Sequence, residues 1–190
     1  MSMIEVENLN VDEFYAFSAI YLVGKRGLGR RRLAEELGLT ESKTRTMLDH
    51  LKDSGYIETG EKTILTDKGE EVFSQIDDVL IEVSEVDLEY LGVGEYAFAA
   101  LVDIKKSFSV IELRDEAVRA GAKGLTVLEY DNGFTFPEDD DPTKESFEND
   151  IKHLENYFSA EKDFKLLISS GKEKEARKGL WRSIYHLIQN

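Results

Sequence analysis

The chain has 190 residues, with 39 acidic and 24 basic side chains and a formal net charge of −15. Its hydrophobic content of 41 % suits one large or two small folded domains and excludes a disordered chain. The absence of cysteine excludes disulfides, thiolate zinc sites and a cysteine nucleophile. Because the sequence shows neither a secretory leader nor an apolar run of about 18 residues, we expect a cytoplasmic protein with no membrane partner.

Basic residues gather in one part of the chain. Residues 25–52 carry eight Lys or Arg against four Asp or Glu, a local net charge of +4. An acidic surface repels phosphates, whereas a basic segment attracts them. Any contact with nucleic acid is therefore expected in the first third of the chain.

The first 80 residues predict three helices, a short hairpin and a fourth helix. Apolar residues at helical spacing, and short β-prone runs, place these elements at 11–24, 30–37, 41–54, 56–57, 63–65 and 67–80. Thr40 and Thr66 are the expected N-caps of the third and fourth helices. The run LAEELGLTESKTRTMLDHLKDSGYIETGEKTILTDKGEEVF resembles the winged helix-turn-helix superfamily. The resemblance implies that fold for residues 11–80.

The third helix is the candidate DNA-reading element. Thr44, Met47 and Leu48 form its apolar stripe, so other residues of its first turns face away from the core. A helix N-terminus favours phosphate oxygens, and Lys or Arg there reaches phosphates or the O6 and N7 atoms of guanine. Arginines of the preceding helix are expected to hold flanking phosphates. The predicted DNA-binding residues are Arg30, Arg31, Arg32, Ser42, Lys43, Arg45, Thr46 and His50.

The alternative is a winged helix that binds a protein instead of DNA. Glu41 and Asp49 on the same helix, and Glu58 and Glu61 near the hairpin, favour this alternative because carboxylates repel phosphates. Both interpretations stay open from the sequence, and DNA contact is the preferred one.

From about residue 82 the periodicity changes and a mixed α+β region follows. Strands are predicted at 81–88, 96–102, 125–130, 133–136 and 164–168, and helices at 109–120, through 147–158 and at 172–189. Asp131 and Asn132 suit a tight hairpin turn. The predicted domains are therefore 1–80 and 81–190, and the fold class is α+β with a two-layer second domain.

Three segments of the second region resemble an archaeal protein family without established activity: VGEYAFAALV, ELRDEAVRAGAKGLTVLEYDNG and KEKEARKGLW. In that family a winged helix precedes an α+β domain similar to the GAD domain of some aminoacyl-tRNA synthetases and tRNA amidotransferases. The resemblance implies this two-domain organisation for nearly the whole chain. Its most recognisable stretch includes Arg114, Asp115 and residues 121–124.

Arg114, Asp115 and Lys123 are a candidate ligand-binding site near the C-terminal end of a helix, where Lys123 suits an anion. The same lysine complements the helix dipole without any ligand. Asp115 and Arg119 are four residues apart and are expected to pair on the helix. Structural capping is therefore the alternative to ligand binding.

Other motifs predict no site. Residues 92–97 match G-x-G-x-x-A by letters, but a strand rather than a helix is predicted after them. The acidic run 138–141 lacks the spacing of a calcium loop, and the three histidines stand far apart. Because no catalytic constellation is recognisable, we expect no cofactor, no metal and no enzymatic activity.

The last helix carries two apolar stripes, one of which suffices to cover the core of its own domain. Trp181, Tyr185 and Ile188 form the second stripe at i, i+4 and i+7. Trp and Tyr are enriched at protein interfaces. The second stripe therefore predicts a homodimer interface, with coverage inside the same chain as the alternative.

Taken together, these features favour a transcriptional regulator that binds double-stranded DNA. Its C-terminal domain is expected to dimerise or to sense a small-molecule effector. A homodimer fits this function because a two-fold protein reads two half-sites. The alternative is a non-catalytic interaction module of translation or tRNA-modifying machinery, which the GAD-like half and the acidic charge favour.

Overall fold

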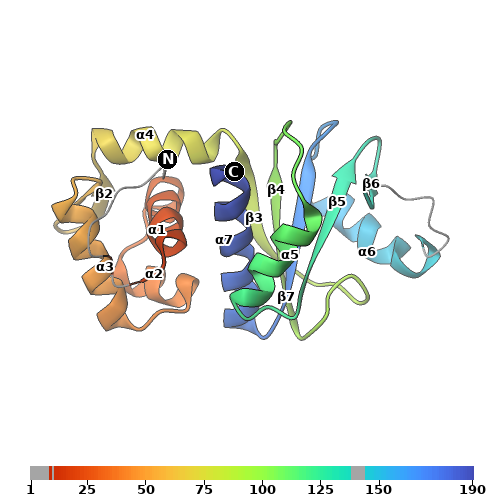
Figure 1. Cartoon of the computed structure of the whole chain (residues 1–190), viewed down its shortest axis with the longest axis horizontal. Coiled ribbons are helices and arrows are strands. Elements are labelled where there is room, and N and C mark those ends of the chain that lie inside the picture. The colour runs from red at the N-terminus through yellow and green to blue at the C-terminus, as the bar shows by residue number, and fades with distance from the viewer. Residues whose placement is uncertain (1–8, 10, 138–143) are drawn as a thin grey trace. The chain divides into compact units, whose positions relative to one another are not determined.

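The computed structural model describes residues 9, 11–137 and 144–190, and the chain divides into two compact units (Figure 1). The first unit contains the described residues up to Asp78 together with Ile188–Asn190, and the second contains Val79–Leu187. The fold is mixed α+β, as predicted, and the division falls two residues before the expected boundary.

The first unit has the element order of a winged helix-turn-helix. Its elements are α1 (Glu13–Arg26), α2 (Arg30–Leu37), α3 (Glu41–Asp53), β1 (Ile57–Thr59), β2 (Thr63–Leu65) and α4 (Asp67–Asp77). The antiparallel β1–β2 pair forms the wing. Fully buried Phe17 and Ile20 of α1, Met47 and Leu51 of α3, and Ile76 of α4 contribute to its core. This core holds α3 in place and leaves its other face exposed.

One boundary differs from the sequence prediction. The fourth helix was expected to continue to Leu80, but α4 ends at Asp77 and Leu80 begins the next strand, opposite Val102. Val79 and Leu80 continue the helical apolar spacing, so the pattern alone does not separate helix from strand. Pairing with a distant strand determines the outcome.

The second unit is a five-stranded antiparallel sheet with helices on both faces (Figure 1). Its elements are β3 (Leu80–Val86), β4 (Tyr96–Val102), α5 (Val110–Arg119), β5 (Gly124–Tyr130), β6 (Phe134–Thr135), α6 (Lys144–Tyr157), β7 (Lys165–Gly171) and α7 (Glu173–Gln189). The strand order is β3-β4-β7-β5-β6. Each predicted strand and helix of this region is therefore present, with bounds shifted by a few residues.

The two faces of the sheet have separate cores. Leu154 and Phe158, on and just after α6, pack in a cluster with Leu101, Leu128 and Ile168 of the strands. α5 and α7 lie on the opposite face. There α7 comes close to the sheet at Gly179, where an added Cβ would lie 2.6 Å from Ala122 and 2.7 Å from Ser169 Oγ. A larger residue at this position would push α7 off the sheet.

Candidate nucleic-acid interface

Short-range contacts fix the start of α3. The Thr40 side chain accepts a hydrogen bond from the Lys43 N–H at 3.3 Å, which caps the helix as predicted. The Thr44 hydroxyl donates to the Thr40 carbonyl at 3.0 Å and is buried. Thr44, Met47 and Leu48 all face the core, so the predicted stripe is confirmed.

The exposed face of α3 carries the predicted DNA-binding residues. Ser42, Lys43 and Arg45 are exposed, whereas Thr46 and His50 are half-buried. Among the described residues, the Lys43 and Arg45 side chains have no hydrogen-bond or ion-pair partner. Two cations in the first turns of a capped helix are thus available to a ligand, with the positive end of the helix dipole beside them.

Arg30, Arg31 and Arg32 occupy the first turn of α2 and are all exposed. Arg30 lies 3.8 Å from Glu41, and Arg31 lies 3.8 Å from Glu35. Exposed ion pairs at this distance contribute little to stability and exchange readily with other anions. These arginines can therefore contact phosphates without a large loss of folding free energy.

The sequence T-D-K-G after the wing joins the wing to the end of α3. Thr66 caps α4 by accepting from the Gly69 N–H at 3.2 Å. The Lys68 ammonium donates to the Ser54 carbonyl at 2.9 Å and lies 4.0 Å from the centre of the Tyr56 ring. At Gly69 an added Cβ would lie 2.1 Å from the Tyr56 carbonyl oxygen. This motif therefore holds the chain after the wing in contact with the residues that follow α3.

No hydrogen bond or ion pair joins the candidate ligand residues of the second unit in the described structure. Arg114, Asp115 and Lys123 are exposed on α5 and in the loop after it, and the described structure records no hydrogen bond or ion pair of their side chains. The expected Asp115–Arg119 pair is wrong, because Arg119 pairs with Glu116, three residues earlier. Position i−3 on a helix faces Arg119 as well as position i−4 does.

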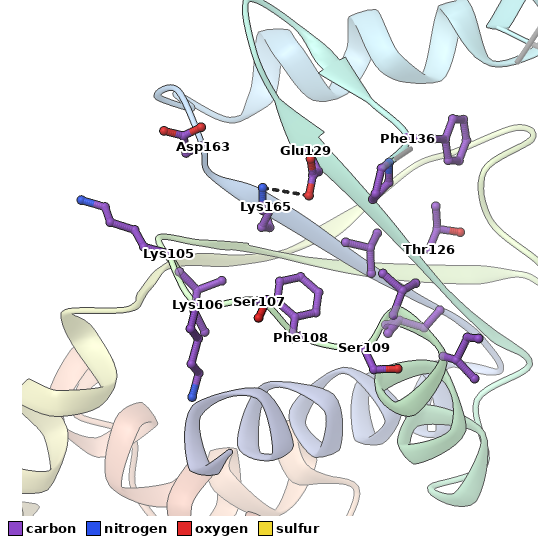
Figure 2. Close-up of a pocket in the computed structure, with 16 residues that line it drawn as sticks. Lys105, Lys106, Ser107, Phe108, Ser109, Thr126, Glu129, Phe136, Asp163 and Lys165 are labelled. Atoms are coloured by element: carbon purple, nitrogen blue, oxygen red, sulfur yellow. Dashed lines mark ion pairs between the residues drawn. The ribbon is translucent and has the colours of Figure 1, made fainter. Parts of the chain in front are cut away.

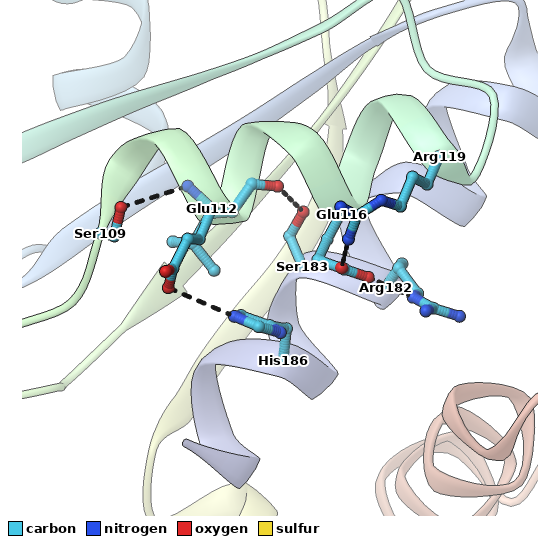
Figure 3. A network of polar contacts seen from close by, with 8 residues as sticks. Ser109, Glu112, Glu116, Arg119, Arg182, Ser183 and His186 are labelled. Carbon is cyan, nitrogen blue, oxygen red and sulfur yellow. Dashed lines mark hydrogen bonds and ion pairs between the residues drawn. The ribbon is translucent and has the colours of Figure 1, made fainter.

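Glu116 is the buried acid that sequence reasoning missed (Figure 3). Its carboxylate accepts from Arg119 on the same helix and from Arg182 of α7, the latter at 2.7 Å. Burial by itself would raise the pKa of Glu116, but the hydrogen bonds and charges of Arg182 and Arg119 outweigh it and hold this pKa below its ordinary value. Glu116 therefore joins α5 to α7 as a carboxylate.

Two further contacts join the same helices (Figure 3). The buried Ser183 hydroxyl donates to the Leu113 carbonyl at 3.0 Å, and His186 lies 3.9 Å from Glu112. The sequence places Ser183 on an apolar helix face, but it does not reveal that its hydrogen-bond acceptor lies on another helix. The surface of α5 that faces α7 is thus structural, and no ligand is needed to explain it.

The three residues of the predicted dimer stripe on α7 differ in exposure. Trp181 is only 2 % exposed, and Tyr185 and Ile188 are half-buried. The role of these residues in dimerisation stays a prediction.

Several predicted absences concern particular segments. Residues 92–97 lead into strand β4 rather than a helix, so the dinucleotide-binding context is missing. The acidic run 138–141 lies outside the described residues. Within the described part of the chain, no three His, Asp or Glu residues gather as metal ligands. No described helix is long and apolar enough to cross a bilayer.

Comparisons with known proteins bear on both units. The first matches the profile of the CggR N-terminal DNA-binding domain over residues 18–80. The second matches a domain of unknown function, DUF4443, over residues 93–187. A solved structure, a hypothetical protein from Pyrococcus horikoshii OT3, is 29 % identical with a TM-score of 0.77, covering 95 % of this chain and 94 % of that chain. Curated proteins gave no significant match. The resemblance to the GAD domain stays a prediction.

Proposed function

The chain belongs to the DUF4443 domain family, and we propose that it is a transcriptional regulator whose α3 binds the major groove of duplex DNA. The proposal rests on a DNA-binding domain at residues 18–80 and on the exposed face of α3. It includes no catalytic step.

The observation that carries the proposal is a pair of exposed cations on α3 that have no side-chain partner among the described residues. Lys43 and Arg45 lie in its first turns, on the side away from the buried Thr44 and Met47. An arginine in this position of a recognition helix reaches the O6 and N7 atoms of guanine. Ser42, Thr46 and His50 supply shorter polar groups on the same helix. Arg45 is therefore assigned to base reading, and Lys43 to phosphate or base contact.

The arginines of α2 are assigned to the DNA backbone. Arg32 is exposed and, in the described structure, has no side-chain partner, while Arg30 and Arg31 are held only by long exposed ion pairs. Phosphate contacts of this kind set the position of a protein on DNA and carry no sequence information. We expect them to supply affinity for all duplexes.

The second unit is proposed to control the first, by homodimerisation, by binding a small-molecule effector, or by both. Two joined copies read two half-sites, which gives more specificity than one small winged helix. Arg114, Asp115 and Lys123 are the candidate residues for an effector, because their side chains are exposed and have no hydrogen-bond or ion-pair partner in the described part of the chain. Trp181, Tyr185 and Ile188 stay candidates for the dimer contact, although Trp181 is buried.

Selection of genomic DNA fragments by the purified chain, followed by sequencing, tests the proposal. The expected result is a common motif in the retained fragments, which the double variant Lys43→Ala/Arg45→Ala fails to enrich. A chain that retains no DNA but co-purifies with components of the translation machinery would support the interaction-module alternative instead.

A further inference from the structure

The cavity of the second unit contains an ion pair that is already formed. This cavity of about 1080 Å³ borders β5, and Lys165 and Glu129 in its wall are paired at 2.9 Å (Figure 2). The pair needs neither an anion nor a cation to complete it, so it indicates no particular ligand. The exposed carboxylate of Asp49 on α3, by contrast, has no hydrogen-bond or ion-pair partner in the described part of the chain.

Asp49 lies near the middle of the exposed face of α3. The opposite face is defined by the buried side chains of this helix, which are Thr44, Met47, Leu48 and Leu51. Because successive helical residues are about 100° apart, the direction opposite to the mean of these four lies within about 30° of Asp49. Asp49 therefore points away from the core, toward whatever this face of the helix binds.

Cations lie on both sides of Asp49. Around the helix the exposed charged residues follow one another in the order Lys52, Arg45, Asp49, Lys43. No ion pair within the described chain joins Asp49 to the neighbouring Arg45 or Lys52. The major groove has phosphates along both walls and base edges on its floor. A helix with lysines at its sides and an acid near its middle therefore directs the acid toward base edges.

Few groups in the major groove can bind a carboxylate. When α3 enters the groove, Asp49 loses water, and an acceptor that finds no donor weakens binding. The base edges offer two donors there, the N6 amino group of adenine and the N4 amino group of cytosine. Adenine presents the acceptor N7 beside N6, whereas cytosine has no acceptor on its own edge in this groove. Cytosine is therefore the base that fits a carboxylate.

We propose that Asp49 determines part of the DNA sequence read by α3, by accepting a hydrogen bond from the N4 amino group of a cytosine. Arg45, assigned above to guanine, lies four residues earlier, about 6 Å away along the helix axis. Base pairs rise by about 3.4 Å, so the cytosine lies within about two base pairs of that guanine. The inference rests on the DNA binding proposed above and names a base that the same helix reads.

The carboxylate contributes to specificity in a second way. It repels the phosphates of every duplex, whereas its hydrogen bond forms only where cytosine stands at the right position. Asp49 therefore lowers affinity for unrelated sequences and partly restores it on its own site, which raises the ratio between the two affinities. An acid that weakens general DNA binding is thus compatible with a helix that selects one sequence.

Selection from random duplexes, followed by sequencing, tests the inference. Wild type is expected to enrich cytosine at one position of its motif. Asp49→Asn is expected to change this position to adenine, because an amide binds N6 and N7 of adenine together. Asp49→Ala is expected to accept all four bases there and to keep the rest of the motif.

The matched control is Asp53→Asn. It removes the same charge from the exposed last residue of α3, about 12 Å from Arg45 along the helix axis. Because the N-terminal part of a recognition helix contacts the base edges, this variant is expected to enrich the wild-type motif. A change of the same position by Asp53→Asn would show that charge alone, rather than a contact of Asp49, determines it.

Anisotropy titrations give the second readout. Wild type should bind the duplex with cytosine at least about tenfold more tightly than one with thymine there, whose O4 is an acceptor. Asp49→Ala, with an unchanged circular dichroism spectrum, should bind both duplexes equally. Asp49 variants that enrich the wild-type motif would overturn this inference alone. A wild type that enriches no motif would contradict the proposed function and the inference together.

Discussion

The guanidinium of Arg30, the first residue of α2, is paired with the carboxylate of Glu41, the first residue of α3, with 3.8 Å between Nη2 and Oε2. Both side chains are more than half exposed, so water and salt weaken their attraction. The pair nevertheless places an acid at the helix N-terminus where a phosphate would bind. Glu41 thus adds a negative charge beside the helix end to which the proposed DNA phosphate would bind.

Replacing this acid is expected to strengthen DNA binding. Glu41→Gln removes a charge that repels phosphate and frees Arg30, so affinity for every duplex should rise by up to about 1 kcal/mol, or about fivefold, at low salt. Fluorescence anisotropy with labelled duplex measures the change. Glu71→Gln, which removes one exposed charge from α4, is the matched control and should leave affinity unchanged. Weaker binding by Glu41→Gln would speak against a phosphate at this helix end.

The arginines of α2 are expected to act through charge alone. Arg32→Ala should weaken binding to specific and random duplexes alike and reduce the slope of log K against log salt by about 0.9. Titrations at several salt concentrations measure this slope. Lys174→Ala, an exposed lysine of the second unit, should leave the slope unchanged. An effect of Arg32→Ala on sequence preference would assign it to base reading instead.

Glu116 is expected to make stability depend on pH. Its pKa is lower in the folded chain than in the unfolded one, because Arg182 and Arg119 outweigh the effect of burial. The folded state therefore gains stability above the unfolded pKa of about 4.3 and loses it as pH falls through the folded pKa. Glu116→Gln should lower the free energy of unfolding by about 1–3 kcal/mol near neutral pH. It should also make this free energy fall less steeply as the pH is lowered. Urea unfolding between about pH 6 and 3 measures both effects. If the variant loses stability with falling pH as steeply as wild type does, Glu116 is not the group responsible.

Asp150 is expected to hold the β3–β4 loop. Its buried carboxylate, 4 % exposed, accepts from the N–H groups of Glu89, Tyr90 and Leu91 at 2.9, 2.7 and 2.8 Å. Asp150→Ala leaves these donors without the acceptor and should destabilise the second unit by roughly 3 kcal/mol or more. Asp150→Asn keeps one acceptor oxygen and should cost less. Equal stability of both variants and wild type in urea would show that water replaces the carboxylate.

Elements fixed by nearby residues were predictable from the sequence. Thr40, the apolar stripe of α3 and Gly38 act within a few positions of one another, so the predicted recognition helix differs from the structure by one residue. The exposed positions of Lys43 and Arg45 follow from the same periodicity. The T-D-K-G segment pointed to the fold, but the contact of Lys68 with Ser54 and Tyr56 required the folded chain.

Contacts between distant residues were not predictable. Glu116 pairs with Arg182, 66 positions away, and Asp150 binds backbone groups 59 to 61 positions away. No periodicity links such residues, because only the sheet brings their elements together. For the same reason the helical spacing of Trp181 did not reveal that it is buried within the chain. The roles of Glu116 and Asp150, whose partners are far away in the sequence, thus needed the structure before they could be assigned.

The effect of Arg45→Ala on sequence-specific binding is the most direct test of DNA recognition through α3. Anisotropy titrations compare wild type and Arg45→Ala on a selected duplex and on a random duplex at one salt concentration. The expected result is a loss of about 1–3 kcal/mol on the selected duplex and a much smaller loss on the random one, so that the specificity ratio falls. An Arg45→Ala protein with wild-type affinity and wild-type preference for the selected duplex would contradict the proposed recognition by α3.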